Sequence, residues 1–184
     1  FVHTFWGLDR DLAYSRHYPA VNWNISYSEY LDNLQSWYEE NIDVDFLECR
    51  QRIVKLLEEE NELLEIARVV GQDVLSDEKR LILETAKAIR LGFLQQNAMS
   101  EIDAQVSLVK QYKMMQTIIL IYDKALKLVN KRIPLSEIRK LGFFEEYVQI
   151  KNTYTNEDIP KFSELNLKIK NNFKKLEEEY KNHI

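Results

Sequence analysis

The chain has 184 residues, 45% hydrophobic and 30% charged, a composition too apolar for a disordered chain and too charged for a membrane one. Only four glycines and three prolines are present, which excludes most all-β folds and favours long helices. The net charge of −5 disfavours nucleic acid as a main partner, and no apolar run approaches the roughly 18 residues of a membrane-spanning helix.

The first 25 residues differ from those that follow, because they combine aromatic residues and turn formers without a sustained helical period. We expect strand and loop there. A Ser-x-x-Glu capping box at Ser26 and Glu29 then predicts a helix that runs to about Glu40. We therefore divide the chain into residues 1–25 and a helical domain, 26–184. Because the chain opens without an initiator methionine or a signal peptide, we expect a piece of a longer protein.

Two helices are predicted next by apolar residues that recur every three or four positions. The first should span about 44–70 and end at Gly71, a favourable residue for a left-handed C-cap. Ser76 is a suitable N-cap for the second, which fades at Gln95–Asn97.

The remaining sequence predicts three more helices. The helix over about 103–131 is the most apolar and should be central. Pro134 should occupy the first position of the next helix, and the last should span about 160–182. The predicted fold class is therefore mostly α, a bundle of about six helices after a short non-helical N-terminal segment.

Most familiar catalytic motifs are missing. The glycines are too scattered for a phosphate-binding loop, and three histidines with one cysteine cannot supply a Cys/His zinc site. The runs Glu58–Glu60 and Glu177–Glu179 are typical of solvated helix faces, and Cys49 lies in a helical stretch as an inert thiol. The residues alone therefore indicate a helical domain without chemistry, such as a scaffold or adaptor.

Two polar-aromatic segments stand apart from that background. In Ser15–Trp23, Pro19 biases Tyr18 toward an extended backbone, which projects the tyrosine ring from a loop. In Phe93–Met99, three consecutive amide residues end a helix. Each segment has a purely structural alternative, core packing for the first and a helix terminus for the second.

Several of these segments, in this order, resemble one known family. The sequence is similar to the catalytic A subunit of V-type and A-type rotary ATPases, from near the end of its nucleotide-binding domain onward. The resemblance covers about the first 130 residues. The matching segments are Phe5–Asp9, Leu12–Ala13, Arg16–Trp23, Ser26–Tyr30, Val70–Glu78, Phe93–Ala98 and Lys110–Tyr112, the last followed by Met115.

The resemblance implies an adenine pocket. In the family an aromatic residue at the position of Tyr18 stacks on the adenine of ATP, and a second aromatic closes the other side. Met99 occupies that second position here, and its thioether can still pack on a π face. Gln96 and Asn97 would supply amide donors and acceptors to the purine, although both also suit a structural role as helix-capping amides.

The resemblance also implies a contact with a rotor. The turn that begins at Gly71 is similar to the acidic, shaft-contacting loop of F-type β subunits. Asp73, Asp77 and Glu78 should then face the central stalk, and the alternative is a plain exposed turn.

The implied function is mechanical. Residues 1–25 would be the tail of an α/β nucleotide-binding domain, and the helical domain would couple nucleotide state to rotation of the central stalk. The partners would be the B subunits of the catalytic hexamer and the stalk, in a cytoplasmic ATPase head peripheral to the membrane and not inserted in it. ATP or ADP would bind, with Mg²⁺ only in the complete subunit, because the phosphate loop and the catalytic acid lie upstream. A helical scaffold or a regulatory nucleotide sensor are the alternatives.

Overall fold

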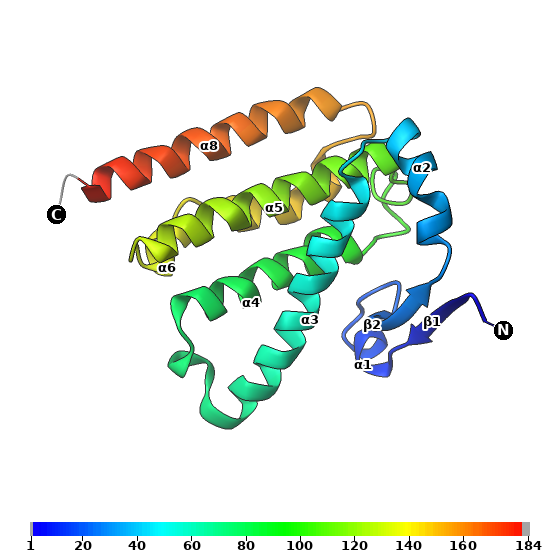
Figure 1. Cartoon of the computed structure of the whole chain (residues 1–184), viewed down its shortest axis with the longest axis horizontal. Helices are drawn as coiled ribbons and strands as arrows, with labels where there is room; N and C mark the ends of the chain where they lie inside the picture. The colour runs from blue at the N-terminus through cyan, green and yellow to red at the C-terminus, as the bar shows by residue number, and fades with distance from the viewer. Residues whose placement is uncertain (1, 182–184) are drawn as a thin grey trace.

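The computed structural model describes residues 2–181, and helices make up most of them (Figure 1). Six helices in this range have 11 residues or more, which confirms the predicted mostly α fold. The elements in chain order are β1 (Thr4–Leu8), α1 (Arg10–Tyr14), β2 (Val21–Ser28), α2 (Leu31–Asn41), α3 (Phe46–Val70), the 3-10 turn η1 (Gln72–Val74), α4 (Asp77–Ile89), the π-helical turn η2 (Arg90–Leu94), α5 (Leu108–Asn130), α6 (Leu135–Arg139), α7 (Phe143–Thr153) and α8 (Ile159–Lys181).

The predicted strands are present in the N-terminal segment, where β1 and β2 form an antiparallel pair. The short helix α1 between them corrects the expectation of a non-helical segment. The predicted helix start at Ser26 is wrong, because β2 continues to Ser28 and α2 begins at Leu31. The Ser26 hydroxyl accepts a hydrogen bond from the Gly7 amide at 3.0 Å and donates to the Asn22 carbonyl at 2.5 Å. The serine therefore joins the two strands where a bulge shifts their register, and it caps no helix.

Helices α3 and α4 form a long hairpin whose ends follow the sequence closely. Gly71 ends α3 with φ of 87°, a backbone conformation that favours glycine. The Ser76 hydroxyl accepts from the Lys79 amide and caps α4. Helix α4 then runs directly into the π-helical turn η2, so the helical path ends at Leu94, next to the predicted amide run.

The fourth and fifth predicted helices need correction. Helix α5 begins at Leu108, capped by Ser107, and the expected start at Asp103 lies in the preceding loop. Pro134 precedes α6 as its N-cap, with an extended ψ of 141°. The fifth helix is also divided in two, because Gly142 adopts a left-handed conformation between α6 and α7.

Helix α5 lies at the centre of the bundle, as its apolar sequence predicts. It packs against α3, α4, α7 and α8, and α8 runs beside it for most of its length (Figure 1). Its own buried side chains include Ile118, Ile121 and Leu128. Gly92 brings η2 close to α7, because a Cβ there would lie 3.0 Å from both the Tyr147 ring and the Val148 Cα.

Candidate functional site

The loop between α1 and β2 presents Tyr18 to solvent, with 54% of the residue exposed. Its neighbour His17 is buried instead. The His17 Nε2 lies 3.1 Å from the Arg90 carbonyl, and because a carbonyl can only accept, this nitrogen carries the proton. The histidine thus anchors the loop to η2 and leaves the tyrosine ring outside.

The loop and the end of the helical path lie side by side, although 78 positions separate Tyr18 from Gln96 in the chain. The Gln96 amide donates to the Tyr18 carbonyl at 2.7 Å. The Gln95 side-chain amide donates to the Arg16 carbonyl at 3.3 Å. The structure therefore brings together the two segments that the sequence singled out.

The other predicted pocket residues are exposed as well. Gln96 and Asn97 are exposed, and Met99 is 94% exposed. The Asn97 side-chain oxygen accepts from the Met99 amide at 3.0 Å, so this oxygen is used within the turn. Among residues 2–181, the Gln96 side-chain amide has no hydrogen-bond partner. A structural role, the alternative to purine binding, therefore suits Asn97 better than Gln96.

An apolar cavity of about 290 Å³ lies behind the loop, and none of the four predicted pocket residues lines it. Leu94 closes it from η2. The other lining side chains come from the strands and the loop: Trp6, His17, Pro19, Val21 and Trp23.

A buried ion pair connects this region to α3. The Arg90 guanidinium contacts both oxygens of Glu60, at 2.8 and 3.1 Å. Glu60 is almost fully buried, which corrects its predicted place on a solvated face. Burial raises the pKa of Glu60, and the Arg90 charge opposes that rise. The same Arg90 supplies the carbonyl that His17 binds, so α3, η2 and the Tyr18 loop are linked in series.

The α3–α4 turn holds the three acidic residues predicted to face a rotor. Asp73 and Glu78 are exposed. Asp77 is half-buried, and its carboxylate accepts from the Leu135 amide at 2.9 Å, which satisfies a free donor at the start of α6. The neighbouring apolar side chain Val74 is largely exposed, whereas Leu75 is buried.

Three buried charged residues lie behind the turn Gln95–Asn97, which follows η2, and their burial was not predicted from the sequence. Lys151 donates to the Gln95 carbonyl at 3.0 Å, and Asp103 accepts from the Asn97 amide at 2.6 Å. Lys110 is fully buried. Both lysines lie in phase with apolar stripes, Lys151 four positions after the buried Tyr147 and Lys110 four before the buried Met114. This spacing was the signal in the sequence that could have predicted the burial of the two lysines.

Within residues 2–181, no three His, Cys, Asp or Glu side chains form a group that could hold a metal ion. No helix there is long and apolar enough to cross a membrane. Burial raises the pKa of the Cys49 thiol to about 11, which agrees with the inert thiol expected from the sequence.

Comparison with known proteins identifies the family. The family model described as "C-terminal domain of V and A type ATP synthase" matches residues 35–139. The chain belongs to this family. The resemblance that the sequence motifs indicated is thereby confirmed.

Individual relatives extend the match beyond the family model. The chain is 48% identical over 181 residues to the V-type ATP synthase alpha chain 2 of Clostridium tetani, covering 98% of this chain and 31% of that protein. It is 44% identical over 180 residues to the V-type ATP synthase alpha chain of Halothermothrix orenii, covering 98% and 30%. The chain therefore spans about a third of the length of these relatives.

Proposed function

We propose that this chain forms one side of the adenine pocket in the catalytic subunit of a V/A-type ATPase and couples nucleotide state to rotation of the central stalk. The observation that carries the proposal is the hydrogen bond between the Gln96 amide and the Tyr18 carbonyl. It joins the backbone of the loop that exposes the Tyr18 ring to the end of a long helical hairpin. Membership of the family favours this function over a scaffold or a regulatory sensor.

The residues at this surface suit the base of a nucleotide. Tyr18 offers a flat, exposed ring, and stacking on a base is worth about 1–3 kcal/mol. The side-chain amide of Gln96 can donate to or accept from a purine edge, and Met99 lies three residues further along the chain. The phosphates of ATP or ADP and the Mg²⁺ ion would be held by the upstream part of the complete subunit, where the resemblance puts the phosphate loop and the catalytic acid.

The hairpin of α3 and α4 suits a mechanical connection. Helix α4 and η2 together have 18 residues, and at about 1.5 Å per residue they extend roughly 25 Å from the acidic turn to the Tyr18 loop. The buried Glu60–Arg90 pair ties the two arms together beside that loop. Movement of the loop on nucleotide binding would therefore be transmitted along a stiff element to the turn.

The turn between α3 and α4 would contact the stalk through Asp73 and Glu78. The exposed Val74 would add an apolar contact with the stalk. Asp77 stands beside them, with its carboxylate bound to the start of α6. The B subunits would flank the domain in the catalytic hexamer, in a cytoplasmic head peripheral to the membrane.

The pocket is tested by Tyr18→Ala in the complete ATPase. We expect the KM for ATP to rise about tenfold with kcat within about twofold, because stacking on the base acts in the ground state and the transition state alike. Tyr14→Ala is the matched control, since Tyr14 is an exposed tyrosine four residues away, in α1. An unchanged KM in Tyr18→Ala would refute the pocket.

The stalk contact is tested by Glu78→Cys carrying a photoactivatable maleimide, also in the complete ATPase. We expect an adduct with the central stalk, because the side chain lies exposed at the turn. The raised pKa of Cys49 should keep that thiol unlabelled at neutral pH. Lys170→Cys, exposed on α8, is the control. If the two variants give the same adducts, the rotor contact is not at this turn.

A further inference from the structure

The turn Gln95–Asn97 is held at three consecutive residues by three different parts of the chain. The Gln95 carbonyl accepts from the Lys151 ammonium of α7 at 3.0 Å. The Gln96 amide donates to the Tyr18 carbonyl at 2.7 Å, and the Asn97 amide donates to the Asp103 carboxylate at 2.6 Å. One side of the turn is therefore the Tyr18 loop, and the other side is a pair of charged side chains.

Both of these charged groups are buried, which is unusual for their residue types. Only 9% of Lys151 and 2% of Asp103 are exposed. Burial lowers the pKa of Lys151, and the Asp103 charge opposes that shift. A buried charge costs free energy unless it is paired and hydrogen-bonded, and here each group spends its hydrogen bond on the backbone of the same turn.

A third buried charge strengthens the pattern. Lys110 is fully buried on α5, and its Nζ has no hydrogen-bond partner among residues 2–181. Burial lowers the pKa of Lys110, while the charges of Asp103 and Asp158 oppose the shift. Asp103 thus compensates two buried ammonium groups and binds the turn at the same time. Well-packed apolar side chains often replace buried charges without loss of stability, which directs attention to a role of these charges beyond packing.

We propose that Lys151 and Asp103 are positioning residues of the nucleotide site. They touch no part of the nucleotide. They hold the backbone of Gln95 and Asn97, and this fixes the Gln96 amide that binds the Tyr18 carbonyl. The height and angle of the stacking ring then depend on two charged groups behind the turn. This inference rests on the proposed adenine pocket.

The experiment replaces Lys151 in the complete ATPase. Lys151→Met keeps the length and the apolar stem but removes the donor to Gln95. We expect the KM for ATP to rise about tenfold with kcat within about twofold, as for loss of one charge-assisted hydrogen bond that acts through Tyr18. Lys151→Arg retains a donor and should restore the KM to within about threefold. Lys170→Met, an exposed lysine of α8, should leave the KM unchanged.

A second measurement separates positioning from general damage. Inorganic tripolyphosphate competes with ATP through the phosphate contacts alone, so its inhibition constant should stay the same in Lys151→Met. A parallel rise in the inhibition constant and the KM would indicate a merely structural role and would overturn the proposal. If Lys151→Met fails to assemble, Asp103→Asn decides: it replaces a charge-assisted hydrogen bond by a neutral one and should raise the KM about fivefold. An unchanged KM in Asp103→Asn would also overturn the proposal.

The failure of this inference differs from failure of the pocket itself. If Tyr18→Ala raises the KM and Lys151→Met does not, the pocket stands and the positioning role is lost. If Tyr18→Ala leaves the KM unchanged, the pocket is refuted, and the positioning role is refuted with it.

Discussion

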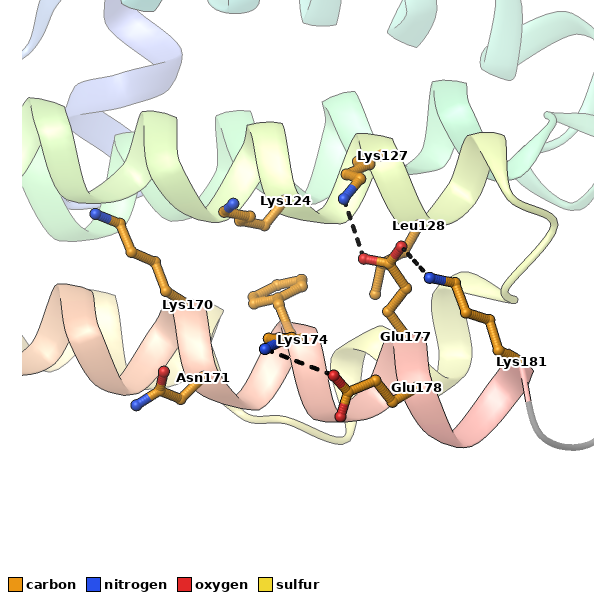
Figure 2. Close-up of a pocket in the computed structure, with 10 residues that line it drawn as sticks. Lys124, Lys127, Leu128, Lys170, Asn171, Lys174, Glu177, Glu178 and Lys181 are labelled. Carbon is orange, nitrogen blue, oxygen red and sulfur yellow. Dashed lines mark hydrogen bonds and ion pairs between the residues drawn. The ribbon is translucent and has the colours of Figure 1, made fainter.

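Lysines occur in two contrasting regions of the molecule. Behind the turn Gln95–Asn97, Lys110 and Lys151 are buried within the bundle. Between the C-terminal halves of α5 and α8, lysines line an open groove of about 420 Å³ (Figure 2). The groove lysines are Lys124, Lys127, Lys170, Lys174 and Lys181.

The two regions use their charges differently. In the groove, Lys127 and Lys181 converge on Glu177 at 3.1 and 3.5 Å (Figure 2). Lys131, at the end of the groove, also contacts Glu177. These lysines remain about half exposed, so water can replace any one contact at little cost. Behind the turn, solvent is excluded. Lys151 depends on its hydrogen bond to the Gln95 carbonyl, and Lys110 depends on the nearby charges of Asp103 and Asp158. The same residue type is therefore a solubilising group in one place and a structural constraint in the other.

The largest expected loss of stability comes from a buried charge that has lost its partner. Arg90→Met leaves Glu60 buried without its partner, and we expect a loss of about 3 kcal/mol in the free energy of unfolding. The matched control is Arg52→Met, which breaks the exposed pair with Asp123 and should cost less than about 1 kcal/mol. Urea denaturation at pH 7 measures both. Equal losses in the two variants would show that burial does not distinguish these ion pairs.

A smaller effect concerns the groove and depends on pH. Hydrogen bonds from Lys131 and Lys127 lower the pKa of Glu177 to about 2, from an ordinary value of 4.5. Its folded pKa lies below the unfolded one, so its stabilisation is present above about pH 4.5 and is lost as the pH falls toward 2. Wild type should therefore be more stable than Glu177→Gln at pH 5–7, and their urea midpoints should converge by about pH 2.

The control for this pH effect is Lys174→Ala, on the same helix, whose contact with Glu178 is exposed and 3.7 Å long. Its urea midpoint should follow that of wild type at every pH. A constant difference between wild type and Glu177→Gln from pH 7 to pH 2 would contradict the assigned pKa.

Local signals in the sequence predicted local structure well. Gly71 and Ser76 mark helix ends because backbone conformation and capping depend on residues a few positions away. Pro19 correctly indicated a loop that exposes Tyr18. The capping box at Ser26 failed because a strand partner 19 positions away binds the same hydroxyl. The prediction that a helix begins at Asp103 was also wrong, because the Asp103 carboxylate accepts a hydrogen bond from the Asn97 amide of the preceding turn and caps no helix.

The sequence by itself determined the class of fold, the hairpin with its acidic turn, and the two motifs that carry the family resemblance. These follow from periodicity, caps and residue identity, which act over short stretches of chain. Only the tertiary structure decided that Glu60 is buried against Arg90, that Asp77 binds α6, and that Lys151 holds Gln95. Burial depends on which helices pack together, so a charged residue reads the same in the sequence whether water or protein surrounds it.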